Sequence, residues 1–392
     1  MSEKAKLKKA LSLGVKAHSR QEYEDDEDDE DDEDCEGHEK DEKDEDTNSD
    51  NDMDILQAQL QHLGIGDDGM EAIQKLLQLL KTGNSTAERV LALDALTKMA
   101  ITCDSKDFSD DSALYRRIHG PVQTVWERVD DEKVKVHAIR ALATIFVFSS
   151  QSRELGEELL EFLVEIIESD GNTVDALNSR EVVVAAMQAW TFVADVWVDM
   201  GGDARRAMKA FHDQLDSRYP DVTYTAALQI AYLFDVQRNP DDAEAQQLYL
   251  PYTLEMLRPR LIVASRGTKA FSKGGRRQAA GLWLRRVIGY LDDNLPLEYS
   301  TVWRKRDDEG QYILKIDTLG PWMLKEYLHT SLGKGFEAHW FDNDKIALLL
   351  GEASLEVLKK PKRRKKSRAE RNGGALPRPS EIRLLADDEA SD

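Results

Sequence analysis

Four stretches of this sequence repeat one helical pattern, and this repetition limits the fold more than any other feature of the chain. The stretches are VLALDALTKMA, VKVHAIRALATIF, VVVAAMQAWTFV and VTYTAALQIAYLF, and we expect their helices to begin at Thr86, Glu132, Arg180 and Asp221. The steps between these starts are 46, 48 and 41 residues. A period of about 40–47 residues is typical of helix pairs in HEAT and armadillo arrays, in which each pair buries its apolar face against its neighbours.

A second helical pattern precedes each repeated stretch, so the chain reads as a series of helix pairs. The first of these patterns, MEAIQKLLQLLKTG, has its apolar residues on one face and stops at Gly83, and Ser85 or Thr86 is a natural N-cap for the next helix. The patterns GPVQTVWERV, RELGEELLEFLVEIIES and DARRAMKAFHDQLDS precede the other three stretches. Small residues mark where a neighbouring helix comes close: Ala92, Ala95, Ala138, Ala141, Ala186, Ala189, Ala227 and Ala231.

These patterns predict an all-α protein: a HEAT/armadillo-like α-solenoid with a helical C-terminal domain and disordered charged tails. We expect a disordered, highly acidic region at residues 1–66, the helical repeats at 67–265, the C-terminal domain at 266–358 and a disordered basic tail at 359–392. The alternative is an irregular helical bundle. QYILKID is the only stretch that reads as a short strand.

The charge of the chain is concentrated in these tails. The whole sequence carries a formal charge of −22, and residues 24–54 hold 21 Asp or Glu against two Lys. Such runs repel themselves and contain too few apolar groups to offset the entropy of folding. The acidic run is either a solvated tail, a decoy that mimics nucleic acid, or a grip on a basic protein.

Several sequence features bear on where the protein is located. No apolar leader resembles a signal peptide, and no run of 18 apolar residues is long enough to span a membrane. The two cysteines, Cys35 and Cys103, form neither a disulfide framework nor a CxxC metal clip. We therefore expect a soluble intracellular protein without a membrane partner, located in the cytoplasm and the nucleus.

The region after Phe271 carries the most specific motifs. It reads SKGGRRQAAGLWLRRVIGYLDDN and then LKIDTLGPWMLKEYLHTSLGKGFEAHWFDND. This region resembles the C-terminal part of the interferon-related developmental regulator family, and the helix with Ala189 and Trp190 is similar to an apolar helix in that family's N-terminal part. The matching positions are Leu284, Arg285, Val287, Ile288, Asp292 and Ile316, together with the family-motif positions Asp317, Leu332, Gly333, Gly335, His339 and Asn343.

The resemblance covers roughly residues 70–358. It implies an all-α, armadillo-like fold, a C-terminal domain of the family's type at residues 266–358, and a regulator without catalytic activity. Members of the family are linked to transcriptional co-regulation and to the binding of translationally inactive ribosomes, so the resemblance implies one of these two activities.

No pattern of residues in the sequence indicates catalysis. SLGKGF lacks the full phosphate-loop motif, and we interpret Gly333 and Gly335 as the end of a helix in a left-handed cap. His329 and His339 are ten residues apart, which is not the i, i+4 spacing of a helical metal site, and Asp317 reads as an N-cap rather than a general base. We therefore predict that the protein is not an enzyme and uses no cofactor, metal or small-molecule substrate.

Two basic segments are candidates for contact with nucleic acid. Nine of the 13 residues from Lys359 to Arg371 are Lys or Arg, and KKPKRRK also has the composition of a nuclear localisation signal. From Met256 to Leu291 the sequence contains no Asp or Glu. The basic arm comprises Lys359, Lys360, Lys362, Arg363, Arg364, Lys365, Lys366, Arg368 and Arg371. The basic patch comprises Arg258, Arg260, Arg266, Lys269, Lys273, Arg276, Arg277, Arg285 and Arg286.

These features together predict a non-enzymatic adaptor that binds a nucleic-acid machine through its solenoid surface and its basic segments. Phe271 and Trp283 interleave the basic patch and could stack on bases, although a Trp on an amphipathic helix is more often a core residue. The ribosome with its RNA is our first choice of partner. A nuclear transcriptional co-regulator complex, bound through protein–protein contacts, is the alternative, and a histone-binding chaperone would rest on the acidic run alone.

Overall fold

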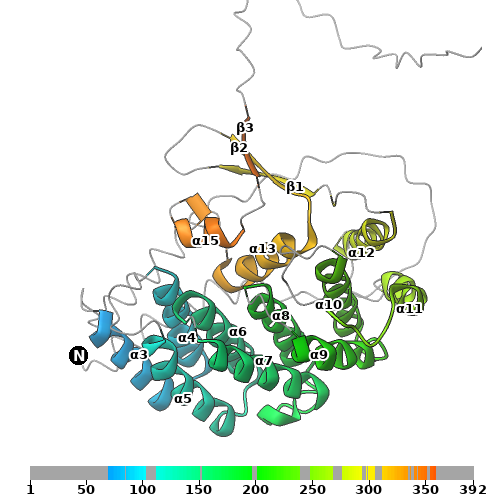
Figure 1. The fold of residues 1–392 in the computed structure, drawn as a ribbon. Coiled ribbons are helices and arrows are strands. Elements are labelled where there is room, and N and C mark those ends of the chain that lie inside the picture. Colours follow the sequence, from blue (N-terminus) through cyan, green and yellow to red (C-terminus); the bar gives the residue numbers. More distant parts are fainter. Residues whose placement is uncertain are drawn as a thin grey trace, which may run out of the picture.

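The computed structural model describes residues 69–83, 85–102, 112–150, 152–196, 201–238, 248–267, 276–293, 297, 299–304, 311–333, 336, 340–341, 343–350 and 354–358 (Figure 1). Most of these residues lie in helices that form a two-layered array, and a small sheet lies to one side of it. The predictions for residues 1–66 and 359–392, and for Cys35 and Cys103, fall outside the described residues.

The helices of the array follow one another in pairs. The pairs are α3 (Gly69–Thr82) with α4 (Thr86–Thr102), α5 (Ala113–Arg128) with α6 (Glu132–Ser149), α7 (Arg153–Glu168) with α8 (Arg180–Val196), α9 (Gly201–Gln214) with α10 (Pro220–Arg238), and α11 (Leu254–Gly267) with α12 (Arg276–Asp293). The second helices α4, α6, α8 and α10 pack against one another in a row, and on the other layer α3 packs on α5 and α7 on α9. The predicted all-α, armadillo-like solenoid is confirmed.

Local capping explains why the repeated helices begin where the sequence predicts. Each starts within one residue of the predicted position, at Thr86, Glu132, Arg180 and Pro220. Before α6, the carboxylate of Asp131 accepts hydrogen bonds from the backbone N–H groups of Lys133 and Val134, at 3.0 and 3.4 Å. Before α4, the hydroxyl of Ser85 accepts the N–H of Glu88 at 3.2 Å, so Ser85 caps this helix.

Small and large apolar residues alternate in the core as the sequence predicts. The alanines at the predicted points of close approach are all at most 1% exposed: Ala92, Ala95, Ala138, Ala141, Ala186, Ala189, Ala227 and Ala231. Large side chains fill the space between them, and Trp190 on α8 is fully buried with its ring edge-on to Phe211 at 5.3 Å. The array is therefore held by packing between neighbouring pairs.

A three-stranded antiparallel sheet adds to the helical fold. Its strands are β1 (Tyr299–Arg304), β2 (Gln311–Ile316) and β3 (Ser354–Leu358), with β2 in the centre. The register pairs Val302 with Ile313 and Ile313 with Glu356. The stretch QYILKID forms β2 as predicted, whereas β1 and β3 were not predicted. Strands as short as β1 and β3 depend on pairing with β2 for their stability.

Helix α13 (Leu319–Leu332) lies between this sheet and the array (Figure 1). The ring of Tyr327 stacks on Phe192 of α8 at 4.1 Å, and its hydroxyl donates to the backbone carbonyl of Arg140 on α6 at 3.0 Å. Asn343, just before α15 (Asp344–Leu349), donates from Nδ2 to the carbonyl of Ile101 on α4 at 2.8 Å. Together with packing of α13 on α10, these contacts tie the C-terminal part to the second helices α4, α6, α8 and α10.

The two ends of α13 test two predictions from the sequence. The prediction that Asp317 is its N-cap is wrong: Asp317 is exposed, and the N-cap is Thr318, whose side chain does not cap the helix. The carboxylate of Asp235 on α10 instead accepts the N–H of Leu319 at 3.3 Å, so a tertiary contact replaces the local cap. At the other end Gly333 terminates the helix with φ +63°, as predicted, but its ψ of −146° differs from that of a left-handed helical cap.

Candidate nucleic-acid interface

The basic patch lies on α11 and α12, at the opposite end of the array from α3 (Figure 1). Helix α11 packs on α10 and α12, and α12 also packs on α10. The described side chains of the patch are Arg258, Arg260, Arg266, Arg285 and Arg286. Arg276 and Arg277 begin α12, but their side chains are not described, and Lys269 and Lys273 lie outside the described residues. The basic arm also lies outside them, directly after β3 in the sequence.

Carboxylates from outside the acid-free window neutralise two arginines of the patch. Nε of Arg258 is 2.7 Å from Oδ2 of Asp292, at the end of α12. Arg260 forms an ion pair with Asp216 and donates a hydrogen bond to Nε2 of His212. The hydrogen bond from Arg260 lowers the pKa of Asp216. The segment from Met256 to Leu291 contains no Asp or Glu, but in the folded protein carboxylates from other segments pair with two of its arginines.

Helix α12 keeps two arginines on an exposed stripe. Leu282, Arg285 and Arg286 are exposed, and neither arginine pairs with a carboxylate of the described residues. Nε of Arg285 donates to the carbonyl of Gly281 at 3.0 Å, and the guanidinium of Arg286 lies 5.9 Å from the ring centre of Trp283. The opposite face of the helix is buried through Leu284, Val287, Ile288 and Leu291. The stripe is therefore positively charged, and its helix is held in place by the buried opposite face.

Exposed apolar side chains accompany these charges. On α11, Met256 and Val263 are 62% and 65% exposed and lie seven residues apart, which places them on one face of the helix, next to the exposed Arg266. Tyr249, just before α11, is 67% exposed, and Leu282 on α12 is 56% exposed. The end of the array therefore presents a surface that is both apolar and basic.

The geometry of Trp283 favours packing over base stacking. Its ring lies 4.6 Å from that of Trp322 on α13 and 5.7 Å from that of Tyr299 on β1, with the latter edge-on. The side chain is partly buried against the core. Phe271, the other aromatic residue of the basic patch, lies outside the described residues. Trp283 therefore joins α12 to α13 and to the sheet.

Two of the described family-motif positions, Leu332 and Asn343, serve the packing of the C-terminal part. Leu332 is buried at the end of α13. Asn343 joins two segments, because its Oδ1 accepts the N–H of Lys345 at 2.9 Å while its Nδ2 bonds to Ile101. Gly335 and His339 lie outside the described residues. Leu332 and Asn343 therefore help to hold α13 and α15 against the array, whereas Gly333 ends α13 and Asp317 is exposed.

The remaining electrostatic features arise from packing. Burial raises the pKa of Tyr327 to about 12, and burial together with the charge of Glu326 raises the pKa of Tyr224. Within the described part of the chain, no group of three His, Cys, Asp or Glu residues could hold a metal ion. None of the described helices has the length and apolar character needed to cross a membrane.

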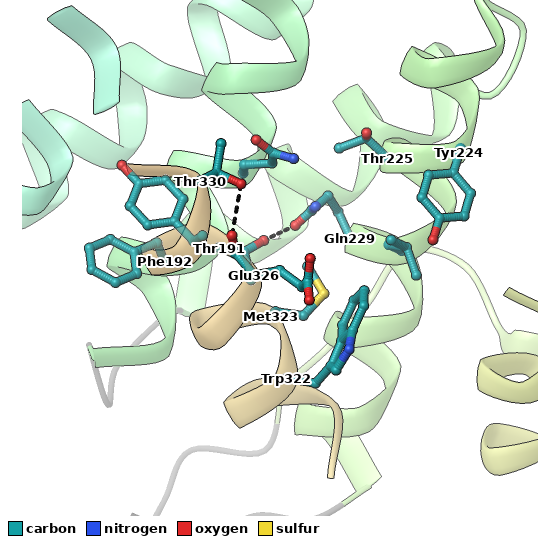
Figure 2. A pocket seen from close by; sticks show the side chains of 12 residues that line it. Thr191, Phe192, Tyr224, Thr225, Gln229, Trp322, Met323, Glu326 and Thr330 are labelled. Carbon is teal, nitrogen blue, oxygen red and sulfur yellow. Dashed lines mark hydrogen bonds between the residues drawn. The ribbon is translucent and has the colours of Figure 1, made fainter. Parts of the chain in front are cut away.

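The structure also contains a polar pocket that the sequence did not predict (Figure 2). It lies between α8, α10 and α13 and has a volume of about 160 Å³. The hydroxyl of Thr191 donates to Oε1 of Gln229 in its wall, and both residues are 1% exposed. A signal for it exists in the sequence, because Thr191 and Gln229 are polar residues at core positions of the apolar stretches AWTFV and ALQIA. The pocket residues on α13, such as Trp322 and Glu326, give no such signal in the sequence.

One comparison with known protein families finds a match to the chain. Residues 53–277 match the model of a family described as Interferon-related developmental regulator. This range covers more than half of the 392 residues and extends from before α3 to the beginning of α12. No curated protein matches the chain.

Proposed function

The chain belongs to the interferon-related developmental regulator family of non-enzymatic regulators, and on that premise we propose that it is an adaptor that binds the ribosome. The observation that carries this proposal is the exposed stripe of α12, where Arg285 and Arg286 stand beside Leu282 at the end of the array. The two arginines of this stripe can bind the phosphate groups of ribosomal RNA.

The chemistry of arginine supports a phosphate partner. A guanidinium group is always charged and presents planar N–H donors that match phosphate oxygens two at a time. Arg285 and Arg286 have no carboxylate partner among the described residues, so their charge is available to such a ligand. Arg258 and Arg260 instead bind Asp292 and Asp216 and hold α11 in place. The nearby apolar side chains Met256 and Val263 offer contact area for bases or for ribosomal protein.

The basic arm provides a second contact in this proposal. It follows β3 directly, so its nine cations begin where the described fold ends at Leu358. A segment of this composition has no core residues and can follow the backbone of an RNA channel. The arm and the α12 stripe together let one chain bind RNA at two separate points, which raises the overall affinity.

A transcriptional co-regulator in the nucleus is the second candidate function. It is favoured by KKPKRRK, which has the composition of a nuclear localisation signal, and by the large surface of the solenoid, which suits protein partners. In this case the basic arm directs import and makes no contact with ribosomal RNA. We propose that the protein is present in both the cytoplasm and the nucleus.

Sedimentation of a cell lysate through a sucrose gradient tests the proposed function. A ribosome-bound adaptor moves with large subunits or whole ribosomes, and treatment with a ribosome-dissociating buffer shifts it with those particles. The double variant Arg285→Ala/Arg286→Ala should move toward the top of the gradient. The matched control Arg153→Ala/Arg180→Ala removes two arginines that pair with Glu157 and Glu181 elsewhere on the array, and it should sediment like the wild type. A wild-type protein that stays at the top in all conditions contradicts ribosome binding and favours the co-regulator.

A further inference from the structure

Helices α11 and α12 differ in charge from the rest of the array. Residues 254–293, which contain both helices, hold nine Lys or Arg against three Asp or Glu, a net charge of +6. Residues 69–238, which contain α3 to α10, hold 18 Lys or Arg against 27 Asp or Glu, a net charge of −9. A strongly acidic ligand is therefore repelled by most of the array and attracted to the end formed by α11 and α12 (Figure 1).

Three arginines at this end of the array are open to an acidic ligand. They are Arg266 on α11 and Arg285 and Arg286 on α12, and all three are exposed. Within the described part of the chain none of the three forms an ion pair, whereas Arg258 and Arg260 already have carboxylate partners. An acidic ligand therefore meets these three side chains without having to displace another carboxylate of the described residues.

The chain itself contains a segment of opposite charge. Residues 24–54 hold 21 Asp or Glu against two Lys, a net charge of −19. Their only apolar side chains are Cys35 and Met53, so the segment offers charge and almost no apolar contact area. A carboxylate accepts two parallel hydrogen bonds from a guanidinium group, as a phosphate does. Residues 24–54 therefore suit the same arginines as the backbone of a nucleic acid.

The chain that joins this segment to the fold is long enough to reach α12. Asp54 lies 15 residues before Gly69, where α3 begins, and 15 residues span up to about 50 Å. Packed helices lie about 8–10 Å apart, so four steps from the first to the fifth described helix pair cover about 32–40 Å. A tethered segment has an effective concentration of up to about millimolar at a site within its reach.

We propose that residues 24–54 bind to Arg266, Arg285 and Arg286 of the same chain and cover them. The acidic segment then competes with the phosphates of RNA for one surface, and a partner with densely spaced phosphates displaces it. As a regulation of RNA binding this inference rests on the proposed function, whereas the contact within the chain involves no RNA. The attraction is electrostatic, so it weakens as the salt concentration rises.

Two methyl probes test the contact without RNA. Leu282 is 56% exposed beside Arg285 and Arg286, and Leu177, between α7 and α8, is 63% exposed and serves as the matched control. The full-length variant Leu177→Met/Leu282→Met, labelled with ¹³C in its methionine methyl groups, is compared with the same variant lacking residues 24–54. We expect the probe at position 282 to differ between the two chains at low salt, and the probe at position 177 to coincide. Both probes should coincide at about 1 M salt, where the Debye length is about 3 Å.

A peptide of residues 24–54, added to the chain that lacks them, tests which cations bind it. The peptide should shift the probe at position 282 saturably. Arg285→Ala/Arg286→Ala should weaken its binding about three- to tenfold, because two ion pairs are lost. The control Arg153→Ala/Arg180→Ala removes the same charge elsewhere on the array and should bind the peptide like the parent chain. Thermal unfolding of each variant shows that the fold is intact.

Three results would overturn the proposal. The probe at position 282 is unchanged by removal of residues 24–54 at low salt, or the control pair of substitutions weakens peptide binding as much as the α12 pair. In the third result, the difference at position 282 in the full-length chain disappears on dilution, which means that the segment binds a second copy of the chain.

Binding of single-stranded RNA separates this inference from the proposed function. If the segment covers the α12 stripe, the chain without residues 24–54 binds RNA more tightly than the full chain at low salt, and Arg285→Ala/Arg286→Ala removes this gain. A chain that shows the contact at position 282 but binds neither RNA nor ribosomes supports the covering and contradicts the proposed function. A chain that sediments with ribosomes but shows no change at position 282 contradicts the covering alone.

Discussion

The hydroxyl of Tyr327 on α13 donates a hydrogen bond of 3.0 Å to the backbone carbonyl of Arg140 on α6, a residue 187 positions earlier in the chain. The same carbonyl accepts the hydroxyl of Thr144 at 2.8 Å, and the ring of Tyr327 stacks on Phe192 of the next second helix. One side chain of the C-terminal part therefore contacts two neighbouring repeats of the array.

Substitutions of Tyr327 should show how much its contacts with α6 and α8 contribute to the stability of the protein. Tyr327→Phe is expected to lower the free energy of unfolding by about 1 kcal/mol, because one hydrogen bond is lost while Thr144 still satisfies the carbonyl. Tyr327→Ala should cost about 3–5 kcal/mol, as loss of a buried aromatic ring does. Urea unfolding gives both values, and Tyr249→Phe, at an exposed position before α11, is the control. Equal stability of Tyr327→Ala and the wild type would show that α13 does not support the array.

The core of the array should be sensitive at Trp190. This side chain is fully buried and packs edge-on against Phe211, so Trp190→Ala is expected to cost about 3–5 kcal/mol. Neighbouring repeats should unfold with it, because each repeat is stabilised by those next to it. Circular dichroism during thermal unfolding checks both points. Leu177→Ala, at a residue that is 63% exposed, should leave the melting temperature nearly unchanged.

The N-cap of α6 should give the protein an acid-sensitive contribution to stability. Burial raises the pKa of Asp131, but hydrogen bonds from Thr86 and from the N–H groups of Val134 and Lys133 outweigh it and lower the pKa overall. A lowered folded-state pKa means that the contribution is present above the unfolded value of about 3.9 and is lost as the pH falls through the folded value. At neutral pH, Asp131→Ala should lower the free energy of unfolding by about 1 kcal/mol.

The measurement for this cap is urea unfolding of the wild type and Asp131→Ala at a series of pH values. The difference between the two proteins should be constant at neutral pH and shrink below about pH 4. Asp130→Ala, at the exposed neighbouring residue, should show no comparable difference. A difference that stays constant down to the acid unfolding of the protein would mean that the cap acts without its charge.

The α12 stripe should determine part of the salt dependence of RNA binding. Each phosphate contact contributes about −0.7 to the log–log salt slope for a single strand, so Arg285→Ala/Arg286→Ala should flatten the slope by about 1.4. Fluorescence anisotropy with a labelled single-stranded RNA at several salt concentrations gives the slope. The Arg153→Ala/Arg180→Ala control should keep the wild-type slope. If both variants change it equally, the effect reflects net charge and not this stripe.

Deletion of residues 359–371 should weaken RNA binding and leave the fold unchanged. The deleted segment carries nine Lys or Arg, and it lies beyond the last described strand. If the arm makes five phosphate contacts, the salt slope should flatten by roughly three to four units. The melting temperature should match that of the full chain. An unchanged slope would leave nuclear import as the role of the arm.

The sequence predicts the array well because its signals are local. The starts of α4, α6 and α8 follow from a cap such as Ser85 or Asp131 and from a helical period that continues for several turns. Buried residues such as Ala138 and Trp190 follow from the same period, because one face of each helix must meet its neighbours. These inferences require only residues that are near one another in the chain.

The features that the sequence does not predict are those made by distant residues. Strands β1 and β3 are stabilised by pairing with β2, and β3 begins 38 positions after the end of β2. The ion pair with Asp216 neutralises the charge of Arg260, which lies in the acid-free segment from Met256 to Leu291. This pair forms only because α9 and α11 come together in the fold, so the sequence does not predict it. The polar pocket likewise exists only once α13 has docked on α8 and α10.

The hydrogen bond between Asn343 and Ile101 has a consequence for the synthesis of the protein. The two residues are 242 positions apart, so at about 5–20 residues per second the ribosome makes Asn343 roughly 12–48 s after Ile101. During this interval α4 has emerged without the segment that finally covers its end. The end of α4 therefore waits for its final partner while the chain is still being made, and incompletely folded chains of this kind are the species on which chaperones act.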